Sequence, residues 1–356
     1  SYVLGGRGME IIYDDERLKT YIGKASIISG DHPILIDAFL EDAYEFDVDA
    51  LCDGDEVFIA GIMQHIEEAG IHSGDSACVI PAYKLSSNAR ESIENHTLKL
   101  AMEFNTVGLI NIQFAIKNDI VYVLEVNPRA SRTVPFISKV IDLPLAKLAA
   151  QLSVGKKLKD MDLSMNRQNK LIAVKKPVFP FNKFPKQNVF LSPEMKSTGE
   201  VIGFDNYLGS AYAKAESGAG NSLPVTGSIF ISVNDSDKIK AIALARDFRE
   251  LGFDIIATEG TAKLFSENGI RSNPIFKVGE GRPNVVDAIK NGEVQLVVNT
   301  PLGAKSRDDE YKIGRSAIRY KVPAITTISG AQAAVRGIRN IKAGSIQYHS
   351  LQEIFT

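Results

Sequence analysis

The residues with the clearest chemical potential surround a predicted β-hairpin. Glu125 and Asn127 lie two positions apart on one predicted strand, so their side chains share a face. If the turn is centred on Asn118, Gln113 lies opposite Val123 and is a diagonal neighbour of Glu125. One carboxylate and two amide oxygens suit Mg²⁺, whose remaining ligands are commonly nucleotide phosphates and water. The spacing indicates a magnesium–nucleotide site, but an exposed polar hairpin face explains it equally well.

Two arginines follow this strand directly. Pro128 ends the strand, and Arg129 and Arg132 come immediately after it. Guanidinium groups beside a metal site can hold phosphate or carbonate oxygens through forked hydrogen bonds. Without a metal site, the same arginines are ordinary surface ion-pair residues.

A loop of small and polar residues, GIHSGDS at 70–76, precedes the hairpin in the chain. Such a loop can wrap the ribose or phosphates of a nucleotide. Its single histidine, His72, is also typical of a solvent-exposed turn. The glycine-rich start of the chain, LGGRG at 4–8, lacks the lysine and the spacing of the known phosphate loops.

A second group of candidates lies far downstream. Thr258 closes a predicted strand, and Thr261 lies in the first turn of the helix that follows, where free N–H groups and the helix dipole favour an anion. Lys238, Lys277 and Asn299 lie near the ends of neighbouring predicted strands and can converge on the same edge. A small phosphorylated ligand fits this arrangement, and an unliganded N-cap is the alternative.

The elements that position the first group form a mixed α and β unit. A strand at 45–50 alternates polar and apolar residues, so we expect one face of its sheet to be wet. A helix is expected to start at Asn88, with Glu91 in capping-box spacing. The hairpin strands are joined by the residues 117–119. The predicted strands of this unit are 34–36, 45–50, 57–60, 111–116 and 120–126.

The second group belongs to a different unit. The segment 157–222 is expected to be an irregular connector, because the prolines around 177–185 interrupt both helices and central strands. After it, strands alternate with helical patterns, which predicts a parallel, doubly wound sheet with its ligand at the carboxyl ends of the strands. The predicted strands are 228–233, 253–258, 275–278, 294–300 and 324–328.

Composition excludes several classes of protein. The chain has 356 residues, enough for two or three domains, with 44% apolar and 24% charged residues. The net charge of −2 and the scattered basic residues argue against non-specific nucleic-acid binding. No apolar run is long enough to span a membrane and no signal peptide is visible, so a cytoplasmic location is expected. Cys52 and Cys78 are too few for a disulfide framework, and their spacing suits no zinc site.

Taken together, these residues resemble a known family along essentially the whole chain. The sequence is similar to the C-terminal portion of the large subunit of carbamoyl phosphate synthetase. The strings that carry the resemblance are SYVLGGR at 1–7, HIEEAGIHSGDS at 65–76, NIQF at 111–114, EVNPRASRTVPF at 125–136, PFNKFP at 180–185 and STGEV at 197–201.

The resemblance implies an α+β and α/β architecture in three parts. Residues 1–156 would be a partial ATP-grasp domain with an antiparallel sheet, 157–222 a connector packed on it, and 223–356 a doubly wound parallel-sheet domain of the methylglyoxal-synthase-like (MGS-like) kind that binds allosteric effectors. The family is a ligase that uses ATP with Mg²⁺, or Mn²⁺ as an alternative, to phosphorylate carbamate to carbamoyl phosphate for pyrimidine and arginine biosynthesis. Its ammonia comes from glutamine through a glutaminase small subunit.

Residue roles carry over from the resemblance position by position. Gln113, Glu125 and Asn127 would bind the metal, and Arg129 and Arg132 would neutralise charge on the phosphoryl group in flight. The nucleotide-binding positions would be Leu40, Glu45, Gly70, Ile71, His72, Ser73, Gln113 and Glu125.

A nucleotide effector, often UMP in the family, would bind the MGS-like domain. One position departs from the pattern, because Pro301 stands where a hydroxyl is expected, which leaves the identity of the effector open. The corresponding effector positions are Ser232, Lys238, Thr258, Thr261, Lys277 and Asn299.

Some members of the family also bind ornithine between the two domains. Glu67, Asp75 and Thr326 match that site, whereas Lys176 and Ala324 replace a carboxylate and a tyrosine. Since Lys176 would repel a cationic ligand, we expect no activation by ornithine.

The chain begins inside an ATP-grasp unit, so the N-terminal part of the large subunit is expected to be a separate partner and the isolated chain to be inactive. A homo-oligomer is left open, and neither a nucleic acid nor a membrane is expected as a partner. Two alternatives remain: a stand-alone nucleotide-binding regulatory module, and another ATP-grasp ligase or carboxylase. The magnesium ligand set argues against the first, and the domain from residue 227 onward against the second.

Overall fold

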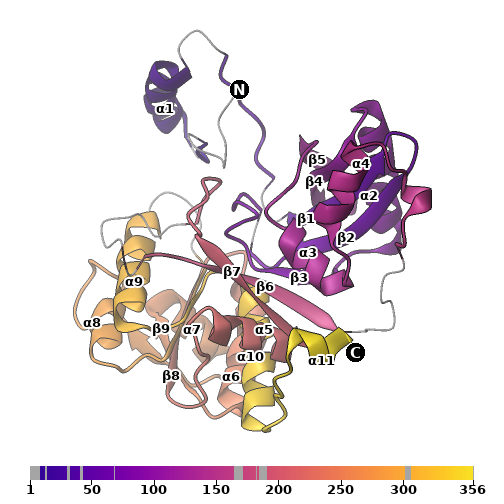
Figure 1. Ribbon diagram of the computed structural model, residues 1–356. Coiled ribbons are helices and arrows are strands. Elements are labelled where there is room, and N and C mark those ends of the chain that lie inside the picture. Colours follow the sequence, from indigo (N-terminus) through magenta and orange to yellow (C-terminus); the bar gives the residue numbers. More distant parts are fainter. Residues whose placement is uncertain are drawn as a thin grey trace.

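Two β-sheets organise the chain in the computed structural model (Figure 1). The structure describes residues 9–12, 14–29, 33–40, 43–67, 69–163, 171–181, 183, 191–300 and 306–355. A seven-stranded antiparallel sheet contains the hairpin, and a five-stranded parallel sheet follows it in the chain. Within these ranges, no helix has the length and apolar character needed to cross a membrane.

The antiparallel sheet has the strand order β5-β4-β1-β2-β3-β6-β7. Its strands are β1 (Tyr44–Asp53), β2 (Val57–His65), β3 (Cys78–Ile80), β4 (Val107–Lys117), β5 (Ile120–Asn127), β6 (Ile172–Val178) and β7 (Gly199–Asp205).

Helices cover both faces of this sheet. Helix α2 (Ser87–Glu103) packs on one face through Ile93 and Ala101, against the apolar side chains of β1 and β4. The short helices α3 (Val134–Ile141) and α4 (Leu145–Ser153) pack on the other face, against side chains such as Leu51 of β1 and Leu109 of β4. Helix α1 (Asp15–Ser29) lies near the N-terminus, apart from the sheet (Figure 1).

Three local predictions for this unit are wrong. The segment 34–36 is not a strand, since among the described residues no strand pairs with it, and Leu35 is 83% exposed. Helix α2 is capped by Ser86, whose side chain accepts a hydrogen bond from the N–H of Ala89, rather than by Asn88. The alternating strand β1 is buried on both faces, because its polar side faces a covered polar layer and not solvent.

The segment 157–222 contains more regular structure than expected. It holds a 3₁₀ turn (η1, Leu158–Asp160), strands β6 and β7, and helix α5 (Leu208–Gly218). Pro177 is tolerated inside β6 because β3 pairs only with the residues from Ala173 to Lys175. Beyond Lys175 no described strand pairs with this edge of β6, so the missing N–H of proline breaks no described ladder bond on that side.

The second sheet is parallel, in the order β10-β9-β8-β11-β12. The order reverses between β8 and β11, so this is the switch point of a doubly wound fold. The predicted strands are all present, the first with the predicted bounds and the others with ends shifted by up to three residues. The observed strands are β8 (Ser228–Val233), β9 (Asp254–Thr258), β10 (Asn273–Ile275), β11 (Leu296–Thr300) and β12 (Ala324–Ile325).

Crossover helices cover both faces of the parallel sheet, as a doubly wound fold requires. On one face lie α6 (Lys238–Glu250), α7 (Glu259–Glu267) and α10 (Ile328–Lys342), and on the other lie α8 (Val285–Lys290) and α9 (Ser306–Tyr320). The expected class, an antiparallel unit followed by a doubly wound parallel unit, is confirmed.

The two sheets share a continuous apolar core. Ile66, which follows β2, and side chains of β3 and β6 join those of α5, α10 and the parallel sheet in one buried cluster. Polar contacts cross the same junction: Thr327 donates to the carbonyl of Ile66 at 3.2 Å, and Lys84 donates to Ser329 at 2.9 Å. The final helix, α11 (Leu351–Phe355), returns to the antiparallel unit, where Phe355 meets Phe204 edge to face. The antiparallel unit and the parallel unit therefore pack against each other through a shared apolar core.

Candidate active site

One face of the antiparallel sheet carries a row of polar side chains. Strand register places Asp47 beside Gln113, and Asp49 beside Asn111. It also places Gln113 beside Glu125. Directly opposed residues point to the same face. The polar groups of β1, β4 and β5 therefore lie together on the face that α3 and α4 partly cover. Of these residues the sequence pattern singled out only Gln113 and Glu125, and the pairing of the strands adds Asp47, Asp49 and Asn111 to them.

The hairpin differs from its prediction in register. The turn has two residues, Asn118 and Asp119, both with positive φ, and Lys117 pairs with Ile120. A β-bulge beside Phe114 adds one residue to β5, which shifts the pairing. Gln113 therefore lies directly opposite Glu125, not diagonal to it.

The predicted metal ligands form a set of oxygen donors that fits Mg²⁺. Among the described residues, the carboxylate of Glu125 has no hydrogen-bond or ion-pair partner, so it is free to bind a cation. Gln113 donates to the hydroxyl of Ser73 at 3.2 Å, which leaves its amide oxygen available. Asn127 accepts a hydrogen bond from Arg129 at 3.0 Å. This bond links Asn127 to a predicted phosphoryl-binding arginine.

The loop 70–76 folds over the polar row. The N–H of Gly70 donates to Glu45 Oε1 at 3.0 Å, which joins two predicted nucleotide-binding residues. Lys175 of β6 is fully buried and donates to the carbonyl of Ser73 at 2.7 Å. Sequence analysis did not find Lys175; its only signal was a charged residue within an apolar strand pattern.

Gly70 is held in a conformation that favours glycine. Its φ is +94°, and a Cβ atom there would lie 2.8 Å from the ring of Phe39. This contact places the segment 33–40, with Leu40 at its end, beside the loop. Ile71 and His72 continue the loop and are partly buried. Burial lowers the pKa of His72, and the N–H of Gly74 donates to its Nδ1 at 3.0 Å.

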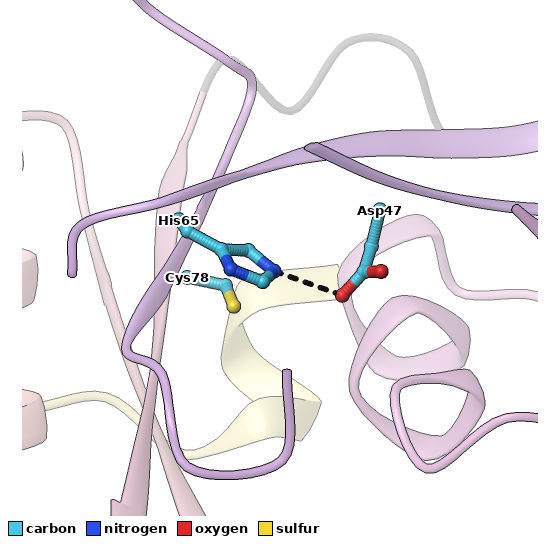
Figure 2. Close-up of side chains that lie close together, drawn as sticks. All are labelled: Asp47, His65 and Cys78. Carbon is cyan, nitrogen blue, oxygen red and sulfur yellow. Dashed lines mark hydrogen bonds and ion pairs between the residues drawn. The ribbon is translucent and has the colours of Figure 1, made fainter. Parts of the chain in front are cut away.

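A buried histidine, His65, lies beside the carboxylate of Glu45. His65 Nδ1 lies 3.0 Å from Glu45 Oε2. On the other side of the ring, His65 Nε2 lies 3.0 Å from Asp47 Oδ2, the contact that Figure 2 shows. Burial by itself lowers the pKa of His65, but Cys78 and Asp47 outweigh this effect and hold the pKa well above its usual value. This direction favours the charged form of His65, which forms a hydrogen bond with Asp47 through Nε2, whereas Nδ1 has no hydrogen-bond partner among the described residues.

The same histidine belongs to the group Asp47, His65 and Cys78, whose potential metal-ligand atoms all lie within 4.8 Å of one another. A metal would need a lone pair on one ring nitrogen. Two of the three side chains already contact protein groups: His65 Nε2 lies 3.0 Å from Asp47 Oδ2, and the thiol of Cys78 donates to the carbonyl of Ser76 at 3.5 Å.

Asp49 is a functional candidate that sequence analysis missed. Its carboxylate accepts hydrogen bonds from the hydroxyls of Ser131 and Thr133 and from the amide of Asn111. Burial raises the pKa of Asp49 to about 6, although these hydrogen bonds oppose the shift. The alternating pattern of β1 was its only signal. Asp49 anchors the turn that carries Arg129 and Arg132, whose exposed side chains border the polar row.

The predicted effector residues meet at the switch point of the parallel sheet. Ser232 at the end of β8 lies 3.3 Å from the hydroxyl of Thr258 at the end of β9. Thr258 in turn donates to Thr261 in the first turn of α7 at 3.4 Å. Asn299 pairs with Ser232 across β11 and β8. Four of the six predicted positions therefore form a hydroxyl-rich edge at the carboxyl ends of the strands.

The two lysines of the effector set are less closely placed. Lys238 forms an ion pair with Asp235 at 2.6 Å, and this contact lowers the pKa of Asp235. Lys277 follows β10 and contributes a favourable charge to the same aspartate. Pro301, the predicted departure from the effector pattern, lies outside the described residues.

The junction between the units contains a buried ion-pair cluster at the predicted ornithine positions. Lys176 lies 2.8 Å from Glu216 and 3.9 Å from Glu67. Its ammonium also lies 5.7 Å from the ring centre of Tyr212. Burial lowers the pKa of Lys176, but Glu216 and Glu67 reverse the shift and raise it. The carboxylates of Glu67 and Glu216 at this site are therefore already paired with the ammonium group of Lys176.

Two family models match the chain. The model described as "Carbamoyl-phosphate synthase L chain, ATP binding domain" matches residues 1–161. The model described as "MGS-like domain" matches residues 240–326. The first range includes the polar row and its loop, and the second includes most of the parallel sheet.

Curated relatives match over nearly all of the chain. The carbamoyl phosphate synthase large chain of Archaeoglobus fulgidus is 55% identical over 99% of this chain, which corresponds to 33% of the relative. The C-terminal section of the same large chain from Aquifex aeolicus is 48% identical over 100% of this chain and 70% of the relative. This chain thus spans about a third of the full-length relatives.

Among solved structures, a complex of biotin carboxylase with β,γ-ATP from Campylobacter jejuni aligns with a TM-score of 0.46 and 14% identity. The alignment covers 59% of this chain and 53% of that protein.

Proposed function

Because the chain belongs to the carbamoyl phosphate synthase large-chain family, we propose that its antiparallel unit forms one side of a MgATP site at which carbamate is phosphorylated to carbamoyl phosphate. The observation that carries this proposal is the pairing of Gln113 with Glu125 beneath a loop that is bonded to Glu45 and Gln113. Glu125 offers a carboxylate for a cation, and Gln113 and the loop offer donors for a nucleotide. The loop also lies over the place where both would bind.

Each group has a distinct task in this proposal. Gln113, Glu125 and Asn127 would hold Mg²⁺, which when bound neutralises charge on the nucleotide phosphates. Glu45 and the loop from Gly70 to Ser73 would bind the nucleoside end, together with the backbone near Leu40. Arg129 and Arg132 would stabilise the equatorial oxygens of the phosphoryl group during transfer.

The arginines need support to act in this way. Asn127 orients Arg129 through its 3.0 Å hydrogen bond, and Asp49 holds the following turn through Ser131 and Thr133. Such fixed donors lose little freedom when the transition state forms. Asp49 and Asn127 would therefore act as positioning residues for the phosphoryl-transfer centre.

The complete reaction needs parts beyond this chain. We propose that the remainder of the large chain and a glutaminase small subunit are its partners, and that the isolated chain does not make carbamoyl phosphate. The product would serve pyrimidine and arginine biosynthesis in the cytoplasm. The MGS-like unit would bind a nucleotide effector such as UMP at the edge formed by Ser232, Thr258, Thr261 and Asn299, with Lys238 and Lys277 facing its phosphate.

The metal proposal is tested by Glu125→Gln in the full-length large chain assembled with its small subunit. Loss of the carboxylate removes the one charged ligand of the set, so carbamoyl phosphate formation should fall at least about tenfold. Glutamine hydrolysis should remain measurable. Glu103→Gln, the same chemical change at an exposed position of α2, is the matched control. Synthesis near the parental rate in Glu125→Gln would show that Glu125 is not a metal ligand.

A further inference from the structure

A basic cavity lies between α8 and α9, on the outer side of the parallel unit. It measures about 700 Å³ and is lined by both helices and by Phe181 of the loop that follows β6. It continues into a second hollow of about 340 Å³ that shares Arg282 and Arg315 with it. Cavities of about 300–1,000 Å³ are typical of small-molecule sites. The space therefore suits a ligand of nucleotide size.

Positive charge dominates the lining. Four basic side chains border the larger cavity, against a single carboxylate, that of Asp287. Among the described residues, no carboxylate lies within ion-pair distance of three of these four cations. The three cations are Lys290, Arg315 and Arg319.

The one acidic group is already neutralised. Both oxygens of Asp287 accept hydrogen bonds from the guanidinium of Arg282, at 2.8 and 3.2 Å, and one of them also accepts from the N–H of Asn284. The hydrogen bond from Asn284, followed by Arg282, lowers the pKa of Asp287, so the carboxylate stays ionised and paired. A ligand would therefore meet an excess of uncompensated cations.

Helix α9 concentrates this excess on one face. Lys312, Arg315 and Arg319 are spaced three and four residues apart, so they lie along the same side of the helix. Like charges at this spacing destabilise a helix. A bound anion would relieve the repulsion, which gives the arrangement a physical reason.

Apolar side chains complete the cavity. Phe181, Val286 and Ile318 provide apolar surface, and Tyr320 adds an aromatic ring. Arginine forks suit phosphate oxygens, and the apolar surface suits a ring or base. We propose that the cavity between α8 and α9 is a binding site for a phosphorylated small molecule that carries an apolar or aromatic moiety.

This site is separate from the effector edge. None of the six predicted effector positions lines the larger cavity. The cavity lies between the helices on one face of the sheet, whereas the effector residues lie at the carboxyl ends of its strands. The inference goes beyond the proposed function and does not depend on it.

The test is calorimetric titration in EDTA with two probes, pyrophosphate and ADP. All proteins carry Thr258→Ala and Lys277→Gln, so that the effector edge contributes little. Arg315→Gln with Arg319→Gln removes two cations of the cavity. Lys240→Gln with Lys263→Gln removes two exposed cations from α6 and α7 and is the matched control. Thermal unfolding verifies that every variant is folded.

The cavity variant should bind both probes at least about tenfold more weakly than the parent, since each charge-assisted hydrogen bond to phosphate is worth about a tenfold change or more. The control should bind within about twofold of the parent. ADP should bind several-fold more tightly than pyrophosphate. Equal weakening in the cavity variant and the control, or no binding by the parent, would overturn the site. Equal affinity for the two probes would overturn the apolar part of the proposal.

Discussion

Asp49 should make the stability of the protein depend on pH. Burial raises the pKa of its carboxyl group from the ordinary 3.8 to about 6 in the folded protein. Ionisation therefore costs more free energy in the folded state than in the unfolded state. Well below pH 3.8 the group is protonated in both states and has no effect, and the loss of stability accumulates between the two pKa values. As the pH rises through 6, the free energy of unfolding falls.

The size of this effect follows from the two pKa values. Moving a pKa from 3.8 to about 6 corresponds to about 3 kcal/mol of stability lost across the whole titration. Roughly half of that loss, about 1.4 kcal/mol, falls between pH 5 and pH 8. Asp49→Asn removes the titrating group, so the variant should lack this part of the pH dependence.

The assay is urea unfolding of the parent and of Asp49→Asn at pH 5, 6, 7 and 8. The free energy of unfolding of the parent, relative to that of the variant, should decline by about 1.4 kcal/mol over this range. Asp160→Asn, at an exposed position of η1, should leave the profile of the parent unchanged. If the profiles of the parent and Asp49→Asn run parallel, Asp49 does not titrate with a raised pKa and the reasoning is wrong.

Three further predictions concern the other sites. UMP should bind the chain saturably in calorimetry and bind at least about tenfold more weakly to Thr258→Ala, which loses a donor at the strand edge; undiminished binding would place the effector elsewhere. Lys176→Met should lower the free energy of unfolding by about 3 kcal/mol, because Glu216 and Glu67 would remain buried without their cation. A smaller loss of stability than that of an exposed Lys→Met control would refute the pairing. Ornithine should not change UMP binding by the parent. Gly70→Ala should destabilise the chain by about 1–2 kcal/mol through its positive φ and its contact with Phe39, and Phe39→Ala should restore part of this loss if the contact contributes.

The sequence by itself determined most of the strand pattern and indicated the family. The alternation of strands and helices after residue 227 predicted every strand of the parallel sheet to within three residues, because crossover connections leave few other topologies. Pro128 ended β5 as expected, since proline cannot extend the ladder. The residue types of Gln113, Glu125 and Asn127 sufficed to suggest a metal site. These inferences depend on backbone chemistry and on neighbours in the chain.

The tertiary structure alone decided the placement of these residues. The two-residue turn and the bulge in β5 together made Gln113 a direct partner of Glu125, and an extra residue in a strand leaves no clear mark on composition. Asp49 and Lys175 drew no attention in the sequence, because a buried polar residue is defined by what covers it. Burial, register and the cover over a sheet face arise from contacts between segments far apart in the chain, and such contacts determine which polar groups become a site.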